Sequence, residues 1–115
     1  MHIVDWFPTI AQVVGLESTD SLSWDGVDQS PTILNGAKAP DRDFYWVQSN
    51  YRRAVRYGDW KVISYSKRAP AKKEDWSLYN LLSDPLEKKN VADLHPKILA
   101  DLHHRFLRHY RLDKK

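Results

Sequence analysis

The fold of this chain is decided by the stretch AVRYGDWKVI, which spans residues 54–63. β-Branched and aromatic residues, which strands favour, lie on both sides of Gly58 and Asp59. A two-residue connection of this kind is typical of a tight β-hairpin. The stretch therefore predicts two antiparallel strands, at residues 53–57 and 60–65.

Two further strands and a helix extend this hairpin. The runs FYWV at residues 44–47 and WSLYNL at residues 76–81 also have strand composition. After His95, apolar residues recur at helical spacing and form one stripe of Leu99, Leu102, Phe106 and Tyr110. The sequence therefore predicts an α+β fold, in which a four-stranded antiparallel sheet is followed by a C-terminal helix.

A different pattern precedes the sheet. Asp5 is placed to cap a short, mostly buried helix over residues 6–14, with Pro8 in its first turn and Gly15 at its end. Residues 16–43 are interpreted as a connection with one helical turn at residues 29–34, closed by a glycine. A similar helix start, DPLE, is predicted after the last strand, at residues 84–87.

Composition and charge exclude several classes of protein. The 115 residues suffice for one modest domain, and the absence of cysteine excludes disulfides, thiolate catalysis and cysteine-rich zinc sites. The net charge of +3 is too small to demand nucleic acid, and no run of about 18 apolar residues exists. Neither nucleic acid nor a membrane is therefore expected as a partner. The chain starts within a helix pattern and without a signal-peptide pattern, which indicates a shortened chain.

Four motifs, in order, resemble the C-terminal region of type I sulfatases, the arylsulfatase family of the alkaline phosphatase superfamily. They are DWFPTI with VGL (5–10, 14–16), DGV with LNG (25–27, 34–36), the hairpin stretch, and LYNL, DPLE and NVA (78–81, 84–87, 90–92). The resemblance implies a large α/β domain that holds the active site, followed by a small subdomain with a sheet and a helix. Residues 1–40 would be the tail end of the large domain, and residues 41–115 the C-terminal subdomain.

The resemblance also implies chemistry that this chain does not carry. Such sulfatases use a formylglycine, made from the Cys or Ser of a C/S-x-P-x-R motif, and a calcium ion with oxygen ligands. The chain has no cysteine and no Ser-x-Pro-x-Arg. Asp5, Asp25 and Asp28 could offer oxygens, but the matched motifs make them cap and turn residues. No catalytic residue, metal ligand or cofactor is therefore expected in this chain, and calcium and formylglycine are implied only for the full-length parent.

Candidate substrate-binding residues lie around the link between the first two predicted strands. Gln48, Asn50, Arg52 and Arg53 have polar and cationic groups suited to a sulfated sugar, whereas the other interpretation is a solvated loop. Arg56 and Lys61 are expected to pair with carboxylates across the sheet or on the large domain.

The last helix carries histidines and a basic end. His103 and His104 point about 100° apart, so a solvated helix face is predicted for them and for His109, in place of a metal site. The cations from Arg105 to Lys115 are expected to complement the helix dipole, and phosphate contact is the alternative.

The sequence thus predicts a C-terminal fragment of a sulfuric ester hydrolase, with a structural role and a place in the wall of the substrate pocket. Its partners would be the missing N-terminal catalytic domain and a sulfated small molecule or glycan. Members of this family are often exported, and the chain leaves its own compartment open. The alternative is a stand-alone module that binds an anionic, sulfated glycan. Phe7, Ile10, Val13 and Trp24 favour the first hypothesis, because they have little apolar surface to pack on within the chain.

Overall fold

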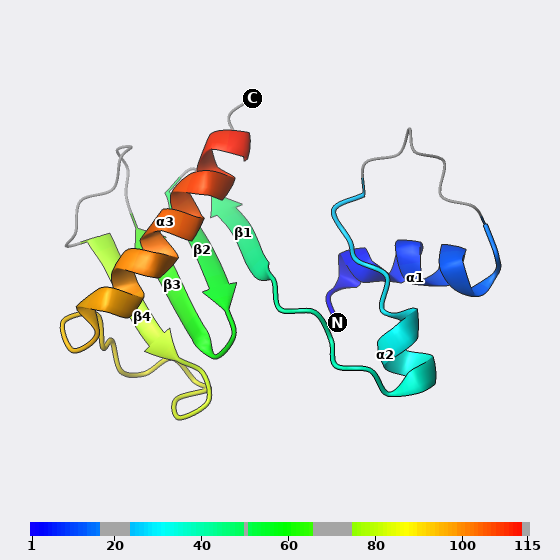
Figure 1. Cartoon of the computed structure of the whole chain (residues 1–115). Coiled ribbons are helices and arrows are strands. Elements are labelled where there is room, and N and C mark those ends of the chain that lie inside the picture. Colours follow the sequence, from blue (N-terminus) through cyan, green and yellow to red (C-terminus); the bar gives the residue numbers. More distant parts are fainter. Residues whose placement is uncertain (17–23, 50, 66–74, 114–115) are drawn as a thin grey trace. The chain divides into compact units, whose positions relative to one another are not determined.

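The computed structural model describes residues 1–16, 24–49, 51–65 and 75–113 (Figure 1). The chain forms two compact units, Met1–Pro40 and Asp41–Lys115. The assignment of residues 1–40 to a larger domain and of residues 41–115 to a C-terminal subdomain stays a prediction.

Within residues 1–16 and 24–40, the first unit contains three short helices. They are a 3-10 helix, η1 (Ile3–Asp5), and the α-helices α1 (Trp6–Val13) and α2 (Ser30–Asn35). Gly15 follows the C-cap of α1, and its φ of 73° is the left-handed conformation that glycine adopts without steric cost. The Thr9 hydroxyl of α1 accepts the backbone N–H of Gln29 at 2.9 Å, a buried hydrogen bond that fixes the start of α2. The predicted helical turn before Gly36 is confirmed.

The predicted helix cap at Asp5 is wrong. Its carboxylate accepts the backbone N–H of His2 at 2.6 Å and that of Val27 at 3.1 Å, and it makes no side-chain capping bond at the start of α1. Asp5 is fully buried, so these bonds satisfy a group that would otherwise be costly to enclose. The carboxylate therefore fastens the DGV turn to η1. Gly26 in this turn lies so close to η1 that a Cβ atom would come within 1.9 Å of the Val4 carbonyl oxygen.

The second unit contains the predicted four-stranded antiparallel sheet. Its strands are β1 (Asp43–Ser49), β2 (Arg52–Tyr57), β3 (Trp60–Tyr65) and β4 (Trp76–Asn80), and they neighbour one another in chain order. The turn between β2 and β3 is the predicted two-residue hairpin, with Gly58 at a φ of 57° and Tyr57 opposite Trp60.

Helix α3 (Pro96–Asp113) crosses one face of this sheet (Figure 1). The apolar stripe predicted on it is buried there at Leu99, Leu102 and Phe106. These side chains pack on alternate residues of the central strands and β4, because successive side chains of a strand point to opposite faces. The resulting core contains Val55, Val62, Trp76, Leu78, Ala92, Leu99, Leu102 and Phe106.

The predicted helix start at residues 84–87 is wrong, because this segment forms turns. Glu87 has a φ of 53°, a left-handed conformation that an α-helix cannot contain. Asp84 accepts the backbone N–H of Lys89 at 2.8 Å, which closes a loop instead of capping a helix. Asn90 then accepts the N–H of Leu78 at 2.9 Å, and this bond fastens the loop to β4.

The prediction that α1 is mostly buried is also wrong within this chain. Only Pro8, Thr9 and Ala11 are buried on the helix, whereas Phe7 is 63% exposed and Ile10 is 52% exposed. The ring of Phe7 contacts Trp24 edge-to-face, with 5.1 Å between centroids. The first unit therefore presents a large apolar surface. Among the described residues, no helix has both the length and the apolar character needed to cross a membrane.

Candidate functional site

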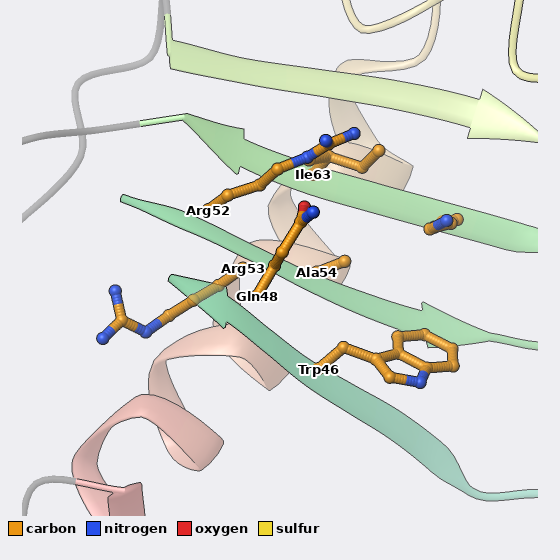
Figure 2. Close-up of a pocket in the computed structure, with 7 residues that line it drawn as sticks. Trp46, Gln48, Arg52, Arg53, Ala54 and Ile63 are labelled. Carbon is orange, nitrogen blue, oxygen red and sulfur yellow. The ribbon is translucent and has the colours of Figure 1, made fainter. Parts of the chain in front are cut away.

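The face of the sheet that α3 does not cover, here called the outer face, carries a shallow depression of about 240 Å³ (Figure 2). Alternate residues of three strands project from this face, as the pleat of a sheet requires. The residues that line the depression are Trp46 and Gln48 of β1, Arg52, Arg53 and Ala54 of β2, and Lys61 and Ile63 of β3.

Strand register accounts for the hollow shape. Ala54 lies opposite Trp46 on one side and opposite Ile63 on the other, so a small side chain stands between two large ones. Ala54 and Ile63 are only 9% and 4% exposed, although neither faces the core under α3. The floor of the depression is therefore apolar and well packed, and its shape follows from the sizes of the side chains that the register places side by side.

The rim of the depression is polar and positively charged. Lys61 Nζ lies 2.6 Å from Glu87 Oε1 and 5.8 Å from the centre of the Trp46 ring. The Arg52 guanidinium lies 4.9 Å from the centre of the Tyr65 ring. No Asp or Glu is among the lining residues, so the rim favours an anion.

Sequence reasoning placed Gln48, Asn50, Arg52 and Arg53 at this site. Gln48 and Arg52 do lie together at the depression, whereas Asn50 lies outside the described residues. The side chain of Arg53 extends away from the others in Figure 2, and its Nε lies 3.7 Å from Asp113 of α3. Arg52 and Arg53 are consecutive on one strand, so their side chains point to opposite faces.

Four lining residues were missed as site residues: Trp46 and Lys61, which carry an aromatic ring and a charge, and the apolar Ala54 and Ile63. Lys61 was expected to pair with a carboxylate, and it does so with Glu87, whereas Arg56 donates its Nε–H to the carbonyl of Gly58 at 2.9 Å. The alternation of side chains along β3 could have placed Lys61 on one face. Only the register between strands shows that Trp46 and Lys61 border the same hollow as Arg52.

A second charged cluster lies on the opposite face, where α3 meets the start of β1. Asp43, whose side chain is 4% exposed, accepts from Arg105 Nη1 at 2.7 Å, contacts His109 Nε2 at 3.1 Å, and pairs with Arg108. Burial raises the pKa of Asp43, but the hydrogen bonds from Arg105, His109 and Arg108 outweigh it and lower the pKa below its ordinary value. The cluster therefore joins the start of β1 to the C-terminal half of α3.

This arrangement corrects the predictions for the last helix. Arg105 and Arg108 bind a carboxylate of the sheet in addition to any effect on the helix dipole. His103 packs edge-to-face on Trp76 at 4.7 Å and His109 stacks on Tyr45 at 5.4 Å, so the predicted solvated face is wrong for both. The pKa of Tyr45 is raised, first by its burial and then by the negative charge of Asp113.

The described residues do not fit the calcium site that sulfatases imply. Both carboxylate oxygens of Asp5 accept backbone N–H groups, and both oxygens of Asp28 are bonded to Ser30. Within the described ranges, no three His, Asp or Glu side chains converge to hold a metal ion. The chain also contains no C/S-x-P-x-R motif in which a formylglycine could be made.

No protein-family model matches the chain. The N-acetylgalactosamine-6-O-sulfatase of Bacteroides thetaiotaomicron is 32% identical over 112 residues, which cover 86% of this chain and 21% of that protein. An uncharacterized sulfatase of Schizosaccharomyces pombe is 39% identical over 62 residues, which cover 54% of this chain and 11% of that protein. The chain therefore spans about a fifth or less of the length of these curated relatives.

Solved structures share the fold. One comes from work on glycosaminoglycan metabolism by Bacteroides thetaiotaomicron, with a TM-score of 0.71 and 23% identity over 90% of this chain and 24% of that chain. The carbohydrate complex of i-CgsB with k-i-k-neocarrahexaose also has a TM-score of 0.71, with 22% identity over 90% of this chain and 23% of that chain. Together with the sequence relatives, these likenesses show that the chain belongs to the sulfatase family and corresponds to the C-terminal region of a sulfatase.

Proposed function

We propose that the chain serves as the C-terminal subdomain of a sulfuric ester hydrolase and forms part of the wall of its substrate pocket. The alignment with N-acetylgalactosamine-6-O-sulfatase over 86% of the chain carries this proposal. The name of that relative supports a sulfated amino sugar as the substrate class. The positively charged outer-face depression supports a contact with an anion on this side of the sheet.

In this proposal, the catalytic groups belong to a part of the protein outside these residues. A formylglycine and a calcium ion would be held there, because the chain has no C/S-x-P-x-R motif and the carboxylate oxygens of Asp5 and Asp28 already accept backbone and hydroxyl hydrogen bonds. The exposed apolar side chains of α1, such as Phe7 and Ile10, support packing on that catalytic part.

The test starts with sequencing of the DNA on the 5′ side of the Met1 codon. This DNA is then translated in the reading frame of the chain. We expect an open frame that encodes C/S-x-P-x-R. Sulfate release from N-acetylgalactosamine 6-sulfate is then measured for the longer protein and for the 115-residue chain. The longer protein should release sulfate and the chain alone should not, with a longer protein changed at the C/S position as the control. A longer protein that hydrolyses no sulfate ester would overturn the proposal.

A further inference from the structure

We infer that the outer-face depression is a subsite for one ring of a sulfated oligosaccharide, with Trp46 as the stacking surface and Arg52 as the partner of the anion. This inference rests on the proposed function and deepens it. It differs from the sequence prediction in two respects, because it adds the indole of Trp46 and removes the guanidinium of Arg53.

Trp46 offers a flat apolar surface in a fixed position. Its ring stacks on Phe44 with 6.0 Å between centroids and an interplanar angle of 18°, and it remains 37% exposed. An indole of this kind packs against the C–H face of a pyranose ring and loses little conformational entropy. The neighbouring Ala54 is small, so a ring that contacts Trp46 can descend toward the floor of the depression.

Arg52 is the cation whose charge is available to a ligand. Lys61 is already paired with Glu87 at 2.6 Å, which neutralises it. Among the described residues, no carboxylate pairs with Arg52, and its contact with the Tyr65 ring leaves its charge in place. A guanidinium presents parallel N–H donors that match a sulfate group better than an ammonium does. Gln48, on the same side of the sheet in Figure 2, adds an amide for a sugar hydroxyl.

The size of the depression favours a single sugar ring over a longer segment. Its volume of about 240 Å³ is smaller than the roughly 300–1,000 Å³ of pockets for drug-sized ligands. An extended acidic peptide would also be matched by charge, but the combination of one aromatic plane, one amide and one guanidinium corresponds to the faces and edges of a sulfated sugar. The depression therefore binds a sugar ring and its sulfate group at the same time.

Calorimetric titration of the 115-residue chain with a 6-sulfated chondroitin tetrasaccharide, and with its desulfated form, tests this inference. Trp46→Ala and Arg52→Ala should each raise Kd by about tenfold or more. The matched control is Arg56→Ala, which removes a cation from the same strand and face but outside the depression, and which should change Kd less than about twofold. Circular dichroism confirms that each variant is folded.

Several outcomes would overturn the inference. They are equal losses of affinity for Arg52→Ala and Arg56→Ala, equal affinity for the sulfated and desulfated sugars, and absence of binding by the unmodified chain.

In the longer protein, Arg52→Ala should raise KM and leave kcat nearly unchanged. A lowered melting temperature with unchanged KM would show that the outer face packs on protein instead. Unchanged KM with normal sulfate release rejects the subsite alone, whereas sugar binding without sulfate release rejects the proposed function.

Discussion

At the level of single residues, Asp43 should contribute strongly to the stability of the second unit. Replacement by Asn removes the charge that Arg105, Arg108 and His109 share and leaves these groups close together. We expect Asp43→Asn to lower the free energy of unfolding by about 2–3 kcal/mol, measured by urea denaturation. Asp101→Asn is the matched control, because Asp101 pairs with the same Arg105 while 58% exposed, and it should cost less than about 1 kcal/mol. Equal losses for both variants would contradict this account.

The lowered pKa of Asp43 predicts how the stability of the second unit changes at acidic pH. A carboxylate with a lower pKa in the folded state adds stability above its unfolded pKa of about 3.9, and this stability is lost as the pH falls through the folded pKa. The difference in stability between the unmodified chain and Asp43→Asn should therefore be constant near neutral pH and shrink below about pH 4. Urea midpoints measured across this range give the result, and a difference that grows in acid would disprove the direction.

Gly26 makes a separate prediction for the first unit. A Cβ atom at this position would meet the Val4 carbonyl oxygen at 1.9 Å, and backbone must move to relieve that contact. Gly26→Ala should destabilise the first unit by roughly 1–3 kcal/mol or more, measured by hydrogen exchange of η1 and α1 amides. Gly36→Ala is the comparison, since no atom lies within 4 Å of its added Cβ, and its left-handed φ should cost about 1–2 kcal/mol.

Residue-scale partners were the least predictable from the sequence. Local rules for helix caps assigned Asp5 to α1, yet one of its donors is Val27, which lies 22 positions away. The three partners of Asp43 lie still farther along the chain. No short pattern encodes such pairs, because they depend on how complete elements pack.

At the level of elements, burial on α3 separates essential from tolerant positions. Leu102 is 1% exposed in the core, whereas Leu112 on the same helix is 62% exposed. Leu102→Ala should lower the free energy of unfolding by about 2–5 kcal/mol, through lost burial and the cavity it leaves. Leu112→Ala should change it by less than about 0.5 kcal/mol. Chemical denaturation of both variants checks this, and similar losses would show that the helix does not pack as described.

Elements were predicted well wherever periodicity and turn chemistry agreed. All four strands, the hairpin at Gly58 and the stripe of α3 were confirmed, because their patterns repeat over several residues. The DPLE segment failed because a proline and an acidic residue mark the start of a helix and a tight turn equally well. The turn is stabilised by the hydrogen bond from the Leu78 N–H to Asn90, which can form only once β4 is in place.

At the level of the whole molecule, the apolar surface of α1 should govern solution behaviour. Ile10 and Val13 are 52% and 57% exposed, so charged residues can replace them without loss of packing within the unit. The chain should bind the dye ANS and self-associate, and Ile10→Glu with Val13→Lys should reduce both, as followed by fluorescence and sedimentation. Ala11→Lys is the control, because Ala11 is 4% exposed and this change should unfold the first unit. Dye binding that survives the double change would place the apolar surface elsewhere.

The candidate site could be predicted only in part from the sequence. Its chemistry, a cationic and polar group of residues near the link between β1 and β2, was visible in the sequence. Its composition was not, since the pleat assigns Arg52 and Arg53 to opposite faces and register brings in Trp46 and Lys61. A set of residues drawn from three strands is a property of the complete sheet.

The cluster around Asp43 also has a consequence for the lifetime of the folded state. It joins residues that are 62 to 66 positions apart, so it closes only after β1 and α3 have come together. Bonds that form after the rate-limiting step of folding slow unfolding and leave the folding rate nearly unchanged. We therefore expect the cluster to lower the unfolding rate of the second unit more than it raises the folding rate. It would then determine how long the sheet and α3 stay packed together under protease or heat.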